Sequence, residues 1–311
     1  MKTLLVAVFA ITLTCAAQEK PIKKEDLKVN TLINGTLYSP QRLTKSTDLV
    51  IIIAGSGSPD RNGNQAGMDN NSLRYLGEQL AQNDIAAFSF DKRTIALMAA
   101  GTLSEKDLSF ENFISDVKDI IAYFKAKKQY RHIIIAGHSE GSLIGMIAAK
   151  DNTDGFISLA GAGRTIDLIL AEQIGKQAPY LKDEVEKDLA ILKSGQTFKL
   201  ENPALGSIFR ESVQPYMISW IKYDPTKEIQ KLKIPILIIN GTKDMQVPVS
   251  DAELLKKAKP EAQLKIITNM NHLFKEIKTD DPAENQASYN NPDLPIASEL
   301  VAVVNQFIKS I

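Results

Sequence analysis

Short, apolar segments recur along this chain, and they constrain its fold more than any other feature of the sequence. They are rich in Ile, Val or Phe and occupy residues 49–54, 85–90, 132–136, 156–160, 234–239 and 264–268. Short runs that are often continuously apolar are typical of strands buried on both faces of a parallel sheet. Because parallel strands need long crossover connections, helices are expected between them.

Helical patterns do lie between and after these segments. Apolar side chains recur at helical spacing over residues 113–124 and again over residues 300–311. Strands that alternate with amphipathic helices predict an α/β fold, with a mostly parallel, twisted sheet and helices on both faces. An antiparallel hairpin is expected before the first parallel strand, near residues 28–38.

Two regions interrupt the alternation. From about residue 164 to 226 no good strand is visible, whereas apolar residues keep helical spacing at Leu181, Val185, Leu189 and Leu192. We predict that this region is a helical cap inserted over the edge of the sheet. Residues 279–295 are rich in Asp, Asn and Pro and are predicted to form an exposed loop before the last helix.

The N-terminus has the pattern of an export signal. Lys2 precedes an apolar run that ends at Leu13, and small residues follow at Cys15 and Ala17. This run is shorter than the about 20 residues that span a bilayer as a helix. We therefore expect a signal peptide over residues 1–17, cleaved after Ala17, and a domain over residues 18–311 that is exported to the periplasm or secreted without stable membrane insertion.

Two other interpretations of the N-terminus stay open. The apolar run can serve as an uncleaved anchor, or Cys15 can be the lipidated first residue of a lipoprotein. Lipidation at Cys15 is disfavoured because Thr14 is bulkier than the residue that usually precedes such a cysteine. Since Cys15 is the only cysteine, cleavage after Ala17 leaves no thiol for a disulfide, a nucleophile or a metal site.

The charge balance excludes further classes of function. The chain carries 37 basic and 37 acidic residues, interspersed, and its formal net charge is zero. Proteins that bind nucleic acid or anionic lipid usually show a basic patch or an excess of positive charge. We therefore expect no nucleic-acid partner and a small, mostly neutral substrate.

The sharpest local motif is Gly137-His138-Ser139-Glu140-Gly141, between an apolar strand and a helical run. This is the Gly-x-Ser-x-Gly pattern of a nucleophile on a strained turn from strand to helix. A Cβ atom at either glycine position is expected to clash with the crowded backbone of such a turn. Ser139 is therefore the predicted nucleophile.

A serine hydroxyl needs an adjacent base, which in this chemistry is nearly always histidine. The chain has three histidines. His138 adjoins the nucleophile and would point away from it, and His132 begins a buried strand, where a structural role is expected. His272 remains, in a loop after the strand 264–268 and therefore near the carboxyl edge of the sheet, where ligands bind. A solvent-exposed loop histidine is the alternative.

Asp244 is the predicted partner that orients the imidazole. It follows the strand 234–239, again at a carboxyl end, and completes the order Ser, Asp, His along the chain. A turn aspartate that binds only the local backbone is the alternative. The other position where such folds carry the acid, after the strand 156–160, holds Gly161-Ala162-Gly163 instead.

Two backbone amides are predicted to hold the oxyanion of the tetrahedral intermediate. One is the amide of Glu140, at the start of the helix. The other is the amide of Ser56, in the glycine-rich stretch Gly55-Ser56-Gly57-Ser58 that follows the strand 49–54. A dinucleotide-binding motif starting at Gly55 would need glycine or alanine where Asp60 stands, so this stretch is not interpreted as one, and no Walker lysine follows.

The chain resembles the α/β-hydrolase superfamily over roughly residues 26–311. The stretch 54–64, the Ser139 motif and Asn271-His272-Leu273-Phe274 are similar to those of exported bacterial esterases of the serine aminopeptidase-like or cinnamoyl-esterase-like type. This resemblance implies hydrolysis of carboxylic esters, with short acyl or aryl esters as substrates, and no cofactor or metal. The region 164–226 is where such enzymes vary most and complete the substrate pocket.

The sequence thus favours a serine hydrolase, a carboxylesterase that works through an acyl-enzyme intermediate on Ser139, His272 and Asp244. One alternative keeps these residues but cleaves amides or peptides, as a serine aminopeptidase does. A second alternative is a noncatalytic binding protein on a hydrolase scaffold, although such proteins typically lack one member of the triad, and all its candidates are present here.

Overall fold

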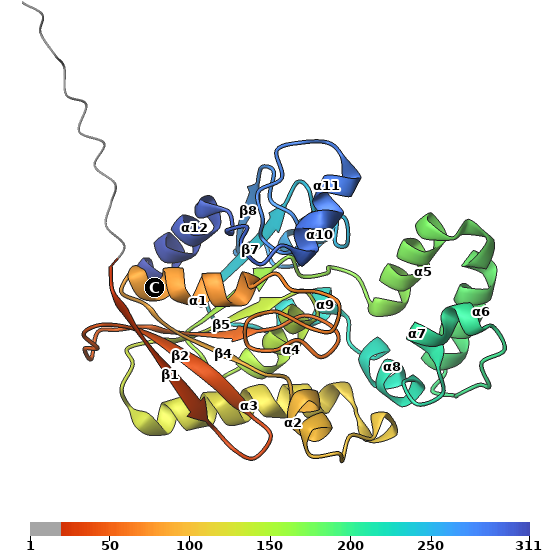
Figure 1. Ribbon diagram of the computed structural model, residues 1–311, viewed down its shortest axis with the longest axis horizontal. Helices are drawn as coiled ribbons and strands as arrows, with labels where there is room; N and C mark the ends of the chain where they lie inside the picture. Colours follow the sequence, from red (N-terminus) through yellow and green to blue (C-terminus); the bar gives the residue numbers. More distant parts are fainter. Residues whose placement is uncertain (1–19) are drawn as a thin grey trace, which may run out of the picture.

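A sheet of eight strands forms the centre of the molecule (Figure 1). The computed structural model describes residues 20–311. The predicted signal peptide, residues 1–17, and the alternative lipidation site, Cys15, lie outside the described residues. The strands are β1 (Ile22–Lys28), β2 (Asn34–Pro40), β3 (Leu49–Ile53), β4 (Ala86–Phe90), β5 (Ile133–His138), β6 (Gly155–Leu159), β7 (Ile236–Gly241) and β8 (Gln263–Ile267).

The sheet is mostly parallel, as the sequence predicts. Its order is β1-β2-β4-β3-β5-β6-β7-β8. Strands β4, β3, β5, β6, β7 and β8 are parallel, whereas β1 pairs antiparallel with β2, and β2 with β4. The expected hairpin is therefore present, with Lys28 opposite Asn34 beside its turn. Each predicted parallel strand lies within two residues of the observed bounds.

Helices cover both faces of the sheet and one of its edges. They are α1 (Ser72–Gln82), α2 (Arg93–Ala99), α3 (Phe110–Lys127), α4 (Glu140–Ala149), α5 (Ile166–Gln177), α6 (Lys182–Lys193), α7 (Gly206–Phe209), α8 (Gln214–Ile221), α9 (Pro225–Gln230), α10 (Val249–Ala258), α11 (Pro282–Ala287) and α12 (Ser298–Lys309). Helices α5 to α8 occupy the predicted cap region. Figure 1 shows them grouped at one end of the sheet, apart from α1 and α12.

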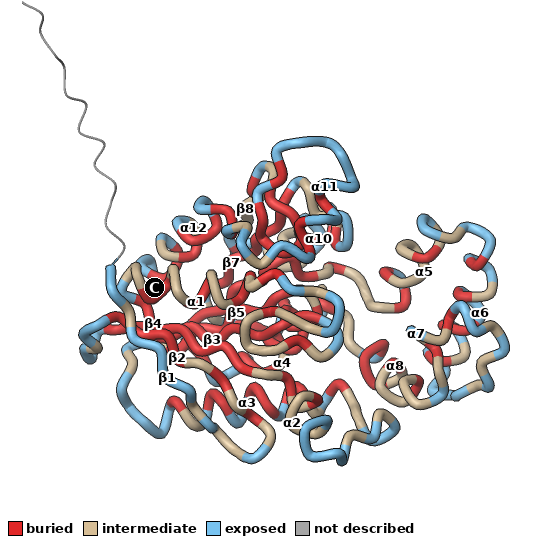
Figure 2. The backbone as a smooth tube through the Cα atoms, in the orientation of Figure 1, coloured by how far each residue is buried: buried red, intermediate tan, exposed pale blue. Residues whose placement is uncertain are grey.

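Alternating side chains of the central strands build two apolar layers. Figure 2 shows the backbone of these strands coloured as buried. In β3, Leu49, Ile51 and Ile53 face a cluster that includes residues of α3, α4 and α10. Val50 and Ile52 face the opposite cluster, which includes residues of α1 and α12. The strand buries both faces, which explains why its sequence is continuously apolar rather than alternating.

The prediction of an exposed loop over residues 279–295 is correct only in part, because most of these residues are exposed but they do not all form a loop. This stretch contains helix α11, whose N-cap is Asp281, with the side chain of Asp281 accepting a hydrogen bond from the amide of Ala283 at 2.8 Å. Asn285, Ser288 and Tyr289 are buried. A polar composition indicated solvent exposure, but these polar side chains are buried because they bind other loops, as described below.

Among residues 20–311, no helix is both long and apolar enough to cross a membrane.

Candidate active site

Ser139 stands on the strained turn that its motif predicts. It follows β5 directly, precedes the first residue of α4, and adopts φ 54° and ψ −120°. A Cβ atom on Gly137 would lie 2.2 Å from the carbonyl oxygen of Gly141, and one on Gly141 would lie 2.5 Å from that of Ala54. Both glycines are therefore required by close approach of the backbone, as the sequence predicts.

Asp244 and His272 come together from the loops after β7 and β8. Nδ1 of His272 donates a hydrogen bond to Oδ2 of Asp244 at 2.8 Å, and both side chains are almost completely buried. Oδ1 of Asp244 accepts hydrogen bonds from the backbone amides of Gln246 and Val247 at 2.9 Å. Asp244 thus binds the local backbone with one oxygen and the imidazole with the other.

The imidazole of His272 lies beside the Ser139 turn. Its ring centroid is 4.7 Å from that of His138, the residue before Ser139. Nε2 of His138 donates to the carbonyl oxygen of His272 at 2.9 Å, which ties the two loops together. Burial, and then the neighbouring imidazole of His272, hold the pKa of His138 well below its ordinary value. His138 therefore stays neutral and acts as a structural link.

The residues of both predicted oxyanion donors lie close to Ser139. A Cβ atom on Gly55 would be 3.2 Å from Cβ of Ser139 and 3.3 Å from Nδ1 of His138, so glycine allows this loop to approach the turn closely. Ser56 and Glu140 both line the cavity that contains Ser139. Because Glu140 is the first residue of α4, its amide has no acceptor within the helix and is available to a ligand.

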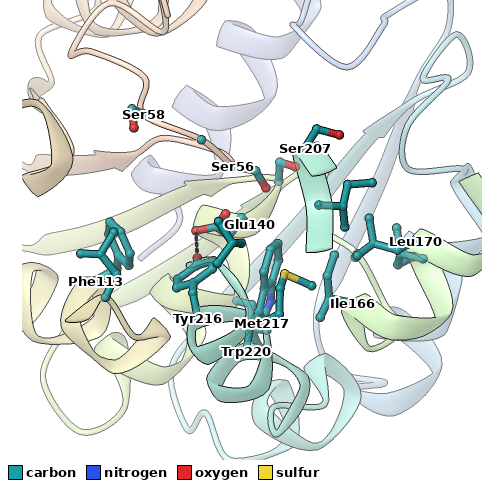
Figure 3. Close-up of a pocket in the computed structure, with 18 of the residues that line it drawn as sticks. Ser56, Ser58, Phe113, Glu140, Ile166, Leu170, Ser207, Tyr216, Met217 and Trp220 are labelled. Atoms are coloured by element: carbon teal, nitrogen blue, oxygen red, sulfur yellow. Dashed lines mark hydrogen bonds between the residues drawn. The ribbon is translucent and has the colours of Figure 1, made fainter. Parts of the chain in front are cut away.

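A cavity of about 430 Å³ opens at Ser139 (Figure 3). Its walls come from the sheet edge, from the segment around α2 and α3, and from the cap helices α5 and α8. Apolar side chains dominate the cap side, among them Ile166, Leu170, Met217 and Trp220. The predicted insertion therefore supplies one wall of the cavity, and a bound molecule would place an apolar group against it.

The residues that the structure describes contain no group of three or more His, Cys, Asp or Glu side chains that could hold a metal ion.

Comparison with known proteins agrees with this architecture. The sequence profile of the BD-FAE family matches residues 36–258. The chain belongs to the BD-FAE family. Esterase EstD from Thermotoga maritima is a relative with 26% identity over 232 residues, which cover 72% of this chain and 54% of that protein. The chain thus spans about half the length of this relative.

Solved structures with the same fold include members called esterases. Est1E from Butyrivibrio proteoclasticus has 16% sequence identity and a TM-score of 0.58, with 92% of this chain and 99% of that chain covered. The Pyrococcus furiosus esterase Pf2001 has 15% identity and a TM-score of 0.53, with 93% and 91% covered. The protein therefore has the α/β-hydrolase fold that the sequence predicts.

A buried ionic cluster next to Ser139 was not predicted from the sequence. Nζ of Lys92 donates to Oε1 of Glu140 at 2.9 Å. The hydroxyl of Tyr216 on α8 donates to the same oxygen at 2.8 Å (Figure 3). The side chains of Lys92 and Glu140 are 3% and 2% exposed. Burial, and then the Glu140 carboxylate, raise the pKa of Tyr216 well above its ordinary value, so the phenol keeps its proton and donates.

The signal that could have revealed this cluster is Glu140 itself. A carboxylate at the start of an otherwise apolar helix, directly after the predicted nucleophile, cannot be buried without a cationic or hydrogen-bonding partner. The identity of that partner depends on the tertiary fold, because Lys92 and Tyr216 are 48 and 76 residues away from Glu140.

A second unpredicted cluster fixes the His272 loop. Oδ1 of Asn271 accepts from the amides of Leu273 and Lys275, and its Nδ2 donates to Oδ1 of Asn285 at 3.0 Å and to Oγ of Ser288 at 2.8 Å. Nδ2 of Asn285 in turn donates to the carbonyl oxygen of Lys243 at 2.7 Å. Helix α11 therefore connects the loop that carries His272 to the loop that carries Asp244.

Proposed function

We propose that this chain is a serine esterase that hydrolyses carboxylic esters through an acyl-enzyme intermediate. Ser139 is the nucleophile, His272 the general base and acid, and Asp244 the residue that orients the imidazole. The amides of Ser56 and Glu140 are the proposed oxyanion donors. The reaction needs no metal or cofactor.

The hydrogen bond between Asp244 and His272 is the observation that carries this proposal. A carboxylate only accepts hydrogen bonds, so the proton of the neutral imidazole resides on Nδ1. Nε2 of His272 is then the atom that can take the proton of the Ser139 hydroxyl. This tautomer, next to a serine on a strained turn, is the arrangement that activates a hydroxyl nucleophile.

In the acylation step, Oγ of Ser139 bonds to the carbonyl carbon while its proton moves to Nε2 of His272. The carbonyl oxygen becomes an oxyanion held by the two amides. When the intermediate collapses, the bond from carbon to the alcohol oxygen breaks, and His272 gives its proton to the leaving alcohol. Water then repeats the sequence on the acyl-enzyme, and the carboxylic acid leaves while the Ser139 hydroxyl is restored.

Short acyl or aryl esters are the proposed substrates. The cavity at Ser139 is lined largely by apolar side chains, and the chain is electrically neutral overall. One structure with the same fold, Est1E of Butyrivibrio proteoclasticus with 17% identity and a TM-score of 0.56, binds ferulic acid, an aryl acid. The structural match covers 89% of this chain and 94% of the Est1E chain. The bound ferulic acid supports an aryl group as one candidate for the acyl part of the substrate.

The proposed function includes export. The basic residue, apolar run and small residues within residues 1–17 support a cleaved signal peptide that directs the enzyme to the periplasm or the medium. The test is the N-terminal sequence of the protein secreted by its host. A mature N-terminus at Gln18 is expected, whereas intact Met1 or a lipid-modified Cys15 contradicts this assignment.

The decisive experiment compares wild type with Ser139→Ala. The wild-type chain should react covalently with a fluorophosphonate probe and hydrolyse p-nitrophenyl acetate faster than aminoacyl p-nitroanilides. Ser139→Ala should fold, lose labelling, and lose kcat by at least about a thousandfold, because nucleophile and base act as a unit. Equal turnover by the variant refutes the assignment, and faster cleavage of the anilides favours the peptidase alternative.

A further inference from the structure

The penultimate residue of β7 is a fully buried asparagine to which the proposed mechanism assigns no role. All residues of this strand are buried, and those before Asn240 are apolar, whereas Asn240 carries an amide and is 0% exposed. Burying an amide costs free energy unless its donors and its acceptor are hydrogen-bonded. The partners of this side chain therefore show what the asparagine contributes.

The side chain of Asn240 binds both ends of the loop 241–248, which follows β7. Nδ2 donates to the carbonyl oxygens of Val247 at 3.1 Å and of Pro248 at 3.2 Å. Oδ1 accepts from the amide of Gly241 at 2.7 Å. An asparagine amide has two donor hydrogens, so both are used at the far end of this loop. The side chain thus closes the loop.

Val247 connects this closure to the proposed catalytic residues. Its carbonyl oxygen accepts from Asn240, and its amide donates to Oδ1 of Asp244 at 2.9 Å. Oδ2 of Asp244 accepts from Nδ1 of His272 at 2.8 Å. A continuous chain of hydrogen bonds therefore leads from Asn240 to the imidazole of His272.

The near end of the loop is held by the backbone of the segment before His272. The amide of Lys243 donates to the carbonyl oxygen of Met270 at 3.0 Å. A Cβ atom on Gly241 would lie 1.9 Å from the same oxygen, so the two loops are in direct contact here. Because this end is fixed by the backbone, the position of Asp244 depends on how firmly the far end is held.

At the far end, Asn240 is a restraint that solvent does not weaken. Gln173 of α5 also binds this end, with Nε2 donating to the carbonyl oxygen of Gln246 at 2.9 Å, but this contact is exposed. The bond from Asn240 to Val247 is buried, where a hydrogen bond is stronger because water does not compete for it. Loss of the Asn240 side chain should therefore loosen the far end of the loop.

We propose that Asn240 is a positioning residue of the esterase reaction, which keeps the carboxylate of Asp244 against the imidazole of His272. Asn240 is not among the described residues that line the cavity at Ser139. Its effect on the reaction therefore passes through Asp244 rather than through contact with the substrate. This inference rests on the proposed esterase function.

A double-mutant cycle tests whether Asn240 acts through Asp244. With p-nitrophenyl acetate, Asn240→Ala should lower kcat by about tenfold, because small displacements of catalytic groups are costly. Asp244→Ala should lower kcat by at least about a thousandfold, because the imidazole loses its orienting partner. Adding Asn240→Ala to Asp244→Ala should lower kcat by less than about twofold more, since no carboxylate remains to be positioned.

Asn70→Ala is the matched control. Asn70 is also 0% exposed, its Nδ2 donates to the carbonyl oxygen of Gly63 at 2.9 Å, and its Oδ1 accepts from the amide of Ser72 at 2.9 Å. The loop that it closes carries none of the proposed catalytic groups. Both alanine variants should unfold at lower urea concentrations than the wild type, but Asn70→Ala should keep the wild-type kcat. If Asn240→Ala does not fold, Asn240→Ser, which leaves a smaller cavity, replaces it in the cycle.

The cycle distinguishes failure of this inference from failure of the esterase function. If Asn240→Ala keeps the wild-type kcat, or lowers kcat by the same factor with and without Asp244, Asn240 does not position the carboxylate, and the esterase function stands. An equal loss of kcat in Asn70→Ala also overturns the inference, because the loss then follows from reduced stability alone. If Asp244→Ala keeps the wild-type kcat, the proposed catalytic triad itself fails, and the role of Asn240 fails with it.

Discussion

Glu140 contributes two groups to the candidate site, a backbone amide and a buried carboxylate. The amide is a proposed oxyanion donor, whereas a negative charge next to a developing oxyanion would oppose catalysis. Nζ of Lys92 lies 2.9 Å from the carboxylate and 4.8 Å from the ring centroid of Phe113, in a site from which water is largely excluded. Lys92 therefore offsets the charge of Glu140 where screening by solvent is weak.

Removing the lysine alone should damage both stability and activity. Lys92→Met leaves the carboxylate of Glu140 buried with only the phenol of Tyr216 as partner. Breaking a buried ion pair in this way costs about 3–5 kcal/mol, and we expect kcat to fall by about 10- to 100-fold because the unpaired charge faces the oxyanion. Urea unfolding and ester hydrolysis measure the two effects.

The double variant Lys92→Met with Glu140→Gln is the matched control. It removes both charges, so stability and kcat should recover most of the loss seen in Lys92→Met. If the double variant is as impaired as the single one, the role of Lys92 is not to offset the charge of Glu140. If Lys92→Met alone has wild-type kcat, the negative charge of Glu140 does not destabilise the oxyanion.

Lys275 provides a pH-dependent contribution to stability. Its side chain is fully buried, Nζ donates to the carbonyl oxygens of Asn70, at 2.8 Å, and of Leu294, and no carboxylate pairs with it among the described residues. Burial lowers the pKa of Lys275 to about 8. In the unfolded chain a lysine titrates near pH 10.4. Between these values the unfolded chain binds more protons, so this group makes the free energy of unfolding rise with pH.

Replacing Lys275 by Met should remove that dependence. The free energy of unfolding of wild type, minus that of Lys275→Met, should increase by roughly 1–2 kcal/mol between pH 7.5 and 9.5, since one pKa unit corresponds to about 1.4 kcal/mol. Urea unfolding at both pH values measures the difference. Lys278→Met, whose side chain is exposed, is the control and should show no such change. A constant difference for Lys275→Met would show that the pKa of Lys275 is not lowered.

Among the elements, α11 is the one that the sequence-based prediction missed. Buried strands such as β3 and β5 were predictable because each is continuously apolar, a local property. The Ser139 turn was predictable because its glycines are local requirements of close backbone approach. Helix α11 has a polar sequence, and its residue Asn285 is buried because it forms hydrogen bonds to Asn271 and to Lys243. No local sequence pattern predicts these two contacts. The same holds for Lys92 and Tyr216 around Glu140.

The connection made by α11 can be tested through Asn285. Asn285→Ala removes its hydrogen bonds to Asn271 and to the carbonyl oxygen of Lys243, and so loosens the loops that hold His272 and Asp244. Because small displacements of catalytic groups are costly, we expect kcat to fall by about tenfold, with little change in KM. Gln286→Ala, at the next and exposed position, is the control and should keep wild-type kcat. Equal kcat in both variants would exclude a positioning role for α11.

At the scale of the whole molecule, the cap is part of the apolar core rather than an appendage. Ile174, Val185, Leu189 and Phe209 of the cap belong to the same buried cluster as residues of β3, α3 and α4. Tyr216 adds a polar link from α8 to Glu140. Elements that share one buried cluster lose their packing together, so the cap and the sheet are expected to unfold in a single transition.

The lone tryptophan allows this expectation to be measured without a label. Trp220 lies on α8, and it stacks on Phe110 of α3 with ring centroids 5.5 Å apart, so its fluorescence reports the packing of the cap on the core. Far-UV circular dichroism reports all helices. In urea the two signals should give the same midpoint and the same slope.

Trp220→Phe combined with Tyr123→Trp moves the reporter to the core helix α3 and should give coincident curves again. A tryptophan transition at clearly lower urea in the wild type, with the core reporter unchanged, would mean that the cap unfolds separately and that the wall of the cavity is a mobile one.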